Sequence, residues 1–192
     1  MKRIQDLVRA GCAMFAITCL LTAAAPAAEI EGVRFAPSVR AGATSLLLHG
    51  VGLLRYKWII KAYVAGLYLP PGVQAKAVLD DVPKRLELHY FYAIDGKDFG
   101  PAANTILRGN VDDETLARLK PRIDAMNALY QNVEPGDRYA LTYLPGVGTE
   151  LSKNDVPLGS VAGADFAAAY FSIWLGREPL DRDLRSQLVE GL

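Results

Sequence analysis

The chain has 192 residues, 51% of them hydrophobic, and its 21 basic and 21 acidic side chains give a formal net charge of zero. This length suits one domain with a substantial core. The balanced charge argues against a nucleic-acid-binding protein, because such proteins present a strongly basic face to the phosphate groups.

The first 27 residues have the three parts of a secretory signal peptide. A positive start is followed by the uncharged run Ala10–Ala24, and then by small residues, Ala25 and Ala27, at the positions that a signal peptidase reads. The run is shorter than the about 20 apolar residues that a membrane span needs. We expect cleavage after Ala27, with the bond after Ala28 as the alternative, and hence a periplasmic or secreted protein. Residues 16–18 make a poor lipobox for an anchor at Cys19.

The mature chain, residues 28–192, is expected to fold as a single domain through packing alone. Both cysteines, Cys12 and Cys19, leave with the signal, so the mature chain has no disulfide, no thiolate nucleophile and no cysteine metal ligand. Cleavage leaves 18 basic and 20 acidic residues, a net charge of −2, which again argues against nucleic acid. The sequence leaves the oligomeric state open.

The first half of the mature chain predicts mostly strands, because branched and aromatic residues dominate it. The alternation of apolar and polar residues and the positions of proline and glycine set the expected boundaries. In chain order we expect one or two edge strands within Ile30–Leu48, central strands at Leu46–Arg55 and Ile59–Leu69, a short helix at Val73–Leu79 and a strand at Lys84–Ile94.

The second half predicts helices, then a β-meander, then helices again. The expected elements are helices at Asp98–Arg108 and after the cap Asp112, strands at Arg138–Leu144, Gly148–Lys153 and Val156–Val161, and helices at Ala164–Leu175 and from Asp181 to near Leu188. Pro121 is expected to kink or split the second helix. This order is typical of an α+β protein, with an antiparallel sheet and helices packed on one face.

Several kinds of chemistry have no residues to support them. The two histidines, His49 and His89, both fall in predicted strands, where a structural role is the common one. No cluster of His, Asp and Glu has the spacing of a metal site, and no glycine-rich loop has the phosphate-binding pattern, so no metal or cofactor is expected. Gly50 and Gly52 lie inside a predicted strand, where they indicate a bulge or a close approach of a helix or ligand.

Arg55 and the tyrosines around it form the strongest candidate for a site. No Asp or Glu lies between Glu31 and Asp80, so Arg55 has no acidic partner nearby in the sequence. It either awaits an anionic ligand or reaches solvent or a distant carboxylate. Tyrosines suit the lining of a pocket for an apolar molecule with one polar end, although each alone is more often a core residue.

The register of the two central strands decides what Arg55 faces. With an odd number of loop residues between the strands, Arg55 shares a face with Val51 and Tyr63, whereas an even number places it with Val64 and Tyr68. The sequence contains no turn motif that selects one of these alternatives.

The motifs of the mature chain resemble those of the chalcone isomerase-like family, in its bacterial, exported branch. The motifs are Gly50-Val51-Gly52-Leu53-Leu54-Arg55, residues 61–69, Pro83-Lys84-Arg85-Leu86, residues 145–149, Gly163-Ala164-Asp165-Phe166, residues 173–176 and Pro179-Leu180-Asp181. The resemblance implies an open-faced sandwich with a pocket between the sheet and the helices. In plant enzymes of the superfamily this pocket closes a chalcone into a ring, and in plastid relatives it holds a fatty acid.

The resemblance assigns expected roles to particular residues. Arg55 matches the arginine of the strand motif, and Tyr63 stands where the fatty-acid-binding relatives have tyrosine. The helical tyrosine of the isomerases is matched only by Phe99, which lacks the hydroxyl, so the catalytic set is incomplete. The polar helix positions fall near Asn104 and Thr105.

The leading hypothesis is therefore an exported protein that binds a small apolar or aromatic acid, such as a fatty acid. Arg55 would pair with the carboxylate, so that Arg55→Ala weakens binding by about 1.5–3 kcal/mol, and Tyr63 would donate a hydrogen bond. The side chains expected to line the tail are Tyr68, Tyr90, Phe166 and Tyr170. The alternatives are an intramolecular lyase that uses Arg55 and Tyr63 on a phenolic ketone, and a structural protein with a filled pocket.

Overall fold

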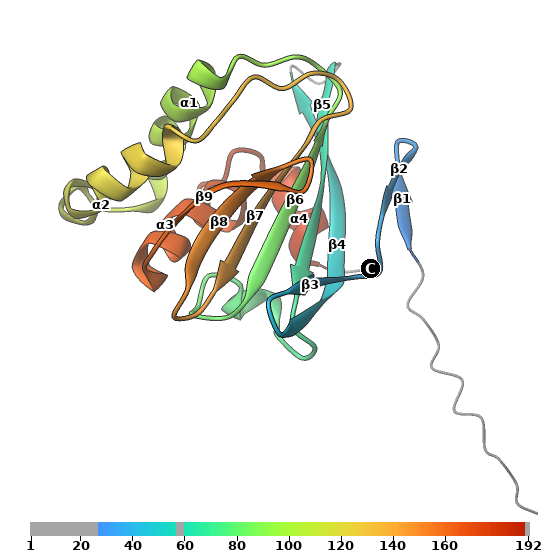
Figure 1. The fold of residues 1–192 in the computed structure, drawn as a ribbon, viewed down its shortest axis with the longest axis horizontal. Helices are drawn as coiled ribbons and strands as arrows, with labels where there is room; N and C mark the ends of the chain where they lie inside the picture. Colours follow the sequence, from blue (N-terminus) through green and yellow to red (C-terminus); the bar gives the residue numbers. More distant parts are fainter. Residues whose placement is uncertain (1–26, 57–59, 191–192) are drawn as a thin grey trace, which may run out of the picture.

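The computed structural model describes residues 27–56 and 60–190 of the chain (Figure 1). The strands are β1 (Ala28–Ile30), β2 (Val33–Phe35), β3 (Ser38–Ala41), β4 (Thr44–Tyr56), β5 (Ile60–Leu69), β6 (Lys84–Tyr90), β7 (Arg138–Leu144), β8 (Gly148–Lys153) and β9 (Val156–Val161). The α-helices are α1 (Gly96–Asn110), α2 (Asp113–Asn127), α3 (Ala164–Leu175) and α4 (Arg182–Val189), with a 3₁₀ turn at Ala75–Ala77.

The strands β3 to β9 form one antiparallel sheet of seven strands, in which each strand pairs with its neighbour in the sequence. The helices cover one face of this sheet, and the small β1–β2 hairpin packs against the other (Figure 1). The predicted fold class, α+β with an antiparallel sheet and helices on one face, is confirmed. No helix among residues 27–56 and 60–190 is long and apolar enough to cross a membrane.

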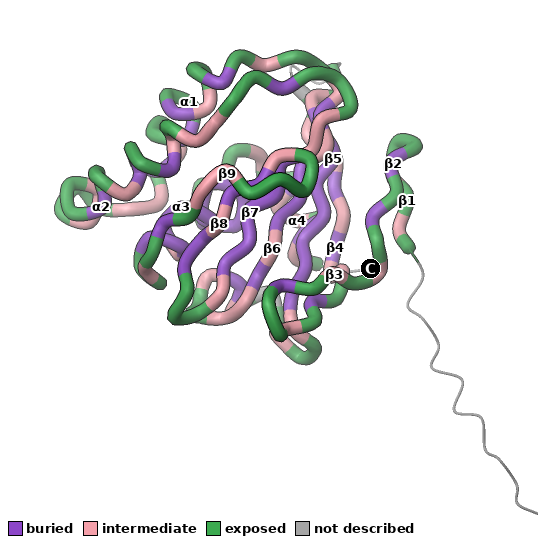
Figure 2. The backbone as a smooth tube through the Cα atoms, viewed as in Figure 1, coloured by how far each residue is buried: buried purple, intermediate pink, exposed green. Residues whose placement is uncertain are grey.

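Alternation along the central strands produces two separate cores. In β5, Tyr63, Ala65 and Leu67 point to the helices, whereas Val64 and Tyr68 point to the β1–β2 hairpin. The result is an almost continuous run of buried residues through β5, β6 and β7 (Figure 2). Gly66 leaves room for the ring of Phe35, since a Cβ there would lie 2.6 Å from the ring.

The helix ends agree with the predicted capping residues. The Asp112 carboxylate accepts a hydrogen bond of 2.8 Å from the backbone of Thr115, and that of Asp181 accepts one of 2.7 Å from Leu184. Pro121 lies inside α2 without splitting it, so the prediction of a split helix is wrong.

The other differences concern element boundaries. The residues from Ile30 to Leu48 supply β2 and part of β1 to a separate hairpin, while β3 forms one edge of the seven-stranded sheet. The expected helix over Val73–Leu79 is only the single 3₁₀ turn, and the strand expected to reach Ile94 ends at Tyr90.

The pairing of β4 with β5 contains two bulges, which decide the register. One lies at His49, between the pairs Leu48–Tyr68 and Gly50–Leu67, and the other lies at Ala62. Three residues, an odd number, lie between the paired ends Tyr56 and Ile60, which by itself would place Arg55 on the face of Tyr63. The extra residue at Ala62 instead turns Tyr63 to the other face. Arg55 therefore lies on the face of Val64 and Tyr68, as in the second alternative.

Candidate functional site

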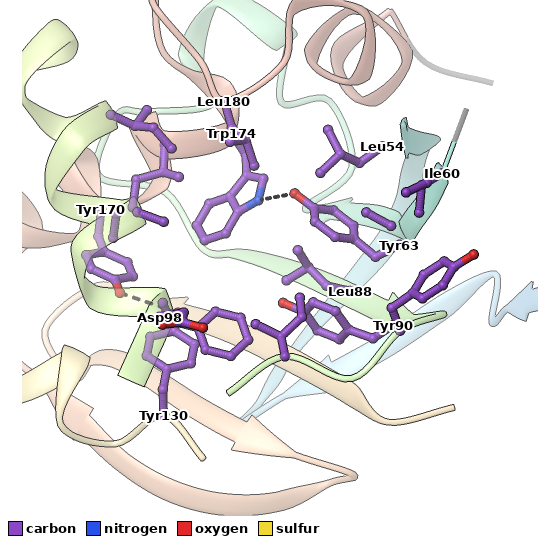
Figure 3. A pocket seen from close by; sticks show the side chains of 18 residues that line it. Leu54, Ile60, Tyr63, Leu88, Tyr90, Asp98, Tyr130, Tyr170, Trp174 and Leu180 are labelled. Atoms are coloured by element: carbon purple, nitrogen blue, oxygen red, sulfur yellow. Dashed lines mark hydrogen bonds between the residues drawn. The ribbon is translucent and has the colours of Figure 1, made fainter. Parts of the chain in front are cut away.

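A pocket of about 510 Å³ lies between the helix-covered face of the sheet and helices α1 and α3 (Figure 3). Strands β4, β5 and β6 form its floor, and the segments that follow β6, α2 and α3 complete its walls. The lining residues are Leu54, Ile60, Ala62, Tyr63, Leu88, Tyr90, Tyr92, Ile94, Asp98, Phe99, Ala102, Ala103, Ile106, Tyr130, Tyr170, Ile173, Trp174 and Leu180.

Helical and strand periodicity explain why these side chains meet. In α1, Phe99, Ala103 and Ile106 recur at three- and four-residue spacing, which places them along one stripe of the helix. Tyr170 and Trp174 do the same in α3. Because Ala103 carries only a methyl group, α1 leaves space where a larger residue would fill the pocket.

One polar pair is buried in the wall of the pocket. The indole Nε1 of Trp174 donates a hydrogen bond of 3.0 Å to the hydroxyl oxygen of Tyr63. That hydroxyl group accepts the indole proton and keeps its own proton for a second partner. Figure 3 shows the Tyr63 hydroxyl at this contact, between strand β5 and helix α3. Tyr63 can therefore donate a hydrogen bond to a molecule in the pocket.

Three further hydroxyl groups border the same space. The hydroxyls of Tyr130 and Tyr170 lie 3.3 Å apart, and Tyr170 also donates to Asn127 Oδ1 at 3.0 Å. The ring of Tyr90 packs against Tyr63, with centroids 5.4 Å apart. Among the described residues, none forms a hydrogen bond with the Tyr90 hydroxyl, and Figure 3 shows this group pointing toward the middle of the pocket.

The surroundings keep these tyrosines uncharged. Burial raises the pKa of Tyr63, Tyr90, Tyr130 and Tyr170 above that of a tyrosine in water, because the ionised form loses its hydration. All four remain neutral hydroxyl groups at physiological pH. The pocket is thus an apolar space with a few neutral hydrogen-bonding groups.

The mouth of the pocket is apolar at three points. Ile60, Tyr92 and Leu180 are large hydrophobic residues that remain exposed, and all three line the pocket. Asp98, in the first turn of α1, is the one charged side chain among the lining residues that the structure describes. An apolar molecule therefore meets hydrophobic side chains before it enters.

The structure brings together some of the predicted site residues. Tyr63, Tyr90 and Tyr170, three of the residues expected to contact a ligand, all line the pocket. Phe99 also lines it, and its ring stacks on that of Tyr130 at 4.7 Å. Tyr63 and Tyr90, which pair across β5 and β6, thus lie on the sheet side of the pocket.

Arg55 does not line the pocket. It is exposed and points to the opposite face of the sheet, where its guanidinium lies 3.6 Å from the carboxylate of Glu31 in the β1–β2 turn. Lys61, its cross-strand neighbour, pairs with the same carboxylate. The physical reason is the bulge at Ala62, which turns Tyr63 toward the helices but leaves Arg55 and Lys61 on the other side.

Tyr68 also lies on the opposite face, in the core beneath the β1–β2 hairpin. Its hydroxyl is buried, and no described residue accepts or donates a hydrogen bond there. Asn104 and Thr105 are exposed on the outer side of α1, where Thr105 donates to the carbonyl of Pro101 at 3.0 Å. Phe166 packs behind Tyr170 rather than in the pocket wall. These four predicted contacts are therefore corrected.

The residues that close the pocket from the helix side were not predicted from the sequence. Trp174, Ile173 and Ala103 belong to apolar helical stripes that read as ordinary core. Tyr130 follows α2, lines the pocket and stacks on the ring of Phe99. Trp174 was part of a family motif, but nothing in that motif indicated its contact with Tyr63.

The histidines have structural surroundings. His49 Nε2 lies 3.2 Å from the carbonyl oxygen of Val189, at the end of α4. His89 lies on the outer face of the sheet, where burial and the nearby Arg138 lower its pKa. Across the described ranges, no three His, Cys, Asp or Glu side chains are grouped closely enough to hold a metal ion.

Comparisons with known proteins agree with this architecture. No curated protein matches the chain in sequence. In fold, the chain is similar to the crystal structure of a fatty-acid binding protein of Arabidopsis thaliana, with a TM-score of 0.64 and 17% identity, over 83% of this chain and 92% of that chain. The sequence model described as chalcone isomerase-like matches residues 27–190. Since this match spans most of the chain, the protein belongs to the chalcone isomerase-like family.

Proposed function

We propose that this is an exported protein that binds a small apolar acid, of the fatty-acid kind, in the pocket between the sheet and helices α1 and α3. The observation that carries the proposal is an apolar pocket of about 510 Å³ into which Tyr63 presents a hydroxyl. Ligand pockets typically combine such an apolar lining with a few placed polar groups that orient the ligand.

The shape and lining of the pocket support a ligand with a long apolar part. The volume of about 510 Å³ falls within the range of about 300–1,000 Å³ of small-molecule sites. Isoleucine, leucine, alanine and aromatic side chains line it. Each Å² of an alkyl tail that they bury would contribute about 25 cal/mol to the free energy of binding. The fatty-acid binding of the Arabidopsis protein with the same fold supports the same class of ligand.

The polar end of the ligand would form a hydrogen bond with the hydroxyl of Tyr63. Its hydroxyl is fixed by Trp174 and keeps a proton to donate, which suits a carboxyl oxygen. Tyr90, across the β5–β6 pairing from Tyr63, presents a second hydroxyl. In this proposal Arg55 has no contact with the ligand, because it pairs with Glu31 on the other face of the sheet.

Two variants and one control test the site by isothermal titration with decanoic acid at pH 5.5. Ala103→Trp is expected to weaken binding more than tenfold, because the indole ring occupies the pocket. Tyr63→Phe is expected to weaken it by up to about tenfold, the effect of one hydrogen bond. Arg55→Ala is the control and should keep the affinity within about twofold.

The proposal would be wrong if the folded wild-type protein bound no decanoic acid, or if Ala103→Trp bound it as well as the wild type. A loss of binding in Arg55→Ala alone would return the site to the opposite face of the sheet. Circular dichroism of each variant shows whether the fold is preserved, so that a loss of binding is not confused with unfolding.

Export is proposed from the first 27 residues, with cleavage after Ala27. The structure supports this position, because Ala28 is the first residue of β1 and pairs with Phe35, so this cut leaves the hairpin complete. Intact mass and N-terminal sequencing of protein recovered from the exported fraction of an expressing bacterium should give a chain that starts at Ala28. A chain starting at Met1 would contradict export by a cleaved signal.

A further inference from the structure

We propose that the pocket takes up its acid in the protonated, uncharged form, so that ligand loading is favoured at low pH and release at high pH. This inference rests on the proposed function, since it concerns the same pocket and the same class of ligand. It is carried by the chemical nature of the groups that surround the polar end of the ligand.

The polar side chains around the carboxyl end of the ligand come from several elements that line the pocket. Strand β5 contributes Tyr63, β6 contributes Tyr90, and α3 contributes Tyr170. Tyr130 reaches the same space after α2, while Asp98 of α1 and Tyr92 lie at the mouth. These are neutral hydroxyl groups and the Asp98 carboxylate, and a second carboxylate, that of Asp181, lies near Tyr63. Carboxylates repel an anionic ligand.

A neutral carboxyl group matches the two nearest hydroxyls. Its carbonyl oxygen can accept the proton of Tyr63, which the contact with Trp174 leaves free. Its own proton can be donated to the hydroxyl oxygen of Tyr90. A carboxylate can only accept hydrogen bonds, and moving it from water into an apolar space costs far more than moving the neutral acid.

The pKa values of the pocket tyrosines indicate that this space destabilises a negative charge. Burial is the largest cause of the raised pKa of Tyr63, Tyr90, Tyr130 and Tyr170. At Tyr63 the hydrogen bond from Trp174 lowers the pKa in part, whereas the nearby Asp181 raises it. The same loss of hydration acts on a ligand carboxyl group at this place. The surroundings therefore favour the neutral acid over its anion.

Of the five described cations on β4 to β7, four pair with carboxylates on the outer face of the sheet. The fifth, Lys84 of β6, lies toward α3 but outside the pocket lining, and it donates to the Asp80 carbonyl. Arg55 and Lys61 both pair with Glu31 beneath the sheet. Arg85 and Arg138 of β6 and β7 pair with Glu87, also on the outer face, at 2.9 and 3.0 Å. These ion pairs place positive charge on the side of the sheet that faces away from the pocket.

The test compares decanoic acid with 1-decanol, which has a similar chain and no acidic proton. Dissociation constants are measured by titration calorimetry at pH 5.5, 6.5 and 7.5. An ordinary carboxyl group has a pKa of about 4 to 5. If only the neutral form binds, the affinity for decanoic acid falls about tenfold per pH unit, or about 100-fold over this range. The reason is that the fraction of the acid in its neutral form falls by the same factor. The affinity for 1-decanol should remain constant.

A variant that adds a cation to the pocket provides the matched comparison. Leu54 is partly exposed, lines the pocket and pairs with Tyr63 across β4 and β5, so Leu54→Arg places a guanidinium beside the polar end. The affinity of this variant for decanoic acid should fall by less than tenfold between pH 5.5 and 7.5, because the guanidinium can pair with the anion.

The outcomes separate this inference from the proposed function. A change of less than threefold for decanoic acid in the wild type would overturn the inference while leaving ligand binding intact. An undiminished 100-fold loss in folded Leu54→Arg would also overturn it, since charge would then not be the cause. Failure of both decanoic acid and 1-decanol to bind the folded wild type would overturn the proposed function itself.

Discussion

Replacing Gly50 with alanine is expected to destabilise the protein by about 3 kcal/mol, at the upper end of the usual cost of overpacking. A Cβ at this position would lie 2.4 Å from the carbonyl oxygen of Leu188 and 2.7 Å from that of Gln187. Both atoms belong to the backbone of α4, so the clash cannot be relieved by a side-chain rotation. Chemical denaturation followed by circular dichroism gives the change in free energy of unfolding.

Gly52→Ala provides a graded control on the same strand. A Cβ there would meet Leu184 Cδ1 at 2.8 Å and Gln187 Cβ at 3.0 Å, which are side-chain atoms that can move. We expect a loss of about 1 kcal/mol. Equal effects of the two substitutions would contradict the account in which the α4 backbone rests directly on the bulge at His49 and Gly50.

The contact between α4 and β4 also matters for the pocket. The segment that joins α3 to α4 contributes Leu180 to the pocket mouth and the cap Asp181 to α4. The backbone of Leu180 donates a hydrogen bond of 2.7 Å to the carbonyl of Ile173, which ties the mouth to α3.

Between pH 7 and pH 9.5 the free energy of unfolding of the wild type is expected to rise relative to that of Lys84→Met by about 2 kcal/mol. Lys84 is fully buried, and burial lowers its pKa from 10.5 to about 8. Between these values the unfolded chain holds the proton that the folded chain has released. Stability therefore rises with pH in this interval, and the burial cost is largest below pH 8.

The surroundings of Lys84 make methionine a reasonable replacement. The ammonium group donates to the carbonyl of Asp80 at 2.8 Å, but that carbonyl also accepts from the backbone of Val82 at 2.7 Å. It therefore keeps a partner in Lys84→Met. The ring of Tyr143, 4.7 Å from Nζ, can pack against the methionine side chain.

Denaturant unfolding at several pH values measures this effect. Lys120→Met is the control, because Lys120 is exposed on α2 and pairs with Asp124, so its substitution should leave the alkaline increase unchanged. Measurements should stop at pH 9.5, because the tyrosines of the unfolded chain begin to lose protons as the pH approaches their pKa of about 10, a contribution that the two proteins share. The raised pKa values of the buried tyrosines mean that the unfolded chain loses protons first, which lowers stability at higher pH. A difference between the wild type and Lys84→Met that stayed constant from pH 7 to pH 9.5 would contradict a charged, buried Lys84.

Local pattern was sufficient for much of the fold. The meander β7–β9 and the helix α3 were predicted with their observed boundaries, because strict alternation and clear turn residues mark them. The turn at Asn154 and Asp155 has positive φ at both residues, as a tight hairpin between twisted strands requires. The family resemblance then supplied the layer arrangement that these elements adopt.

The candidate site was predictable only in part. Tyr63 and Tyr90 belong to regular alternation in β5 and β6, so their common face could be inferred from the sequence. The position of Arg55 could not, because one extra residue at Ala62 changes which face of the sheet it shares. Its partner Glu31 lies in another hairpin, which sequence distance does not reveal.

The sequence by itself determined the elements, the α+β class and an apolar, tyrosine-rich site, because these depend on periodicity, composition and local motifs. Only the tertiary structure decided which side chains share the pocket. That outcome depends on two bulges in the β4–β5 pairing and on how closely α1, α3 and α4 approach the sheet. Such features arise from packing between segments far apart in the chain, where a displacement of one residue reverses the direction of a side chain.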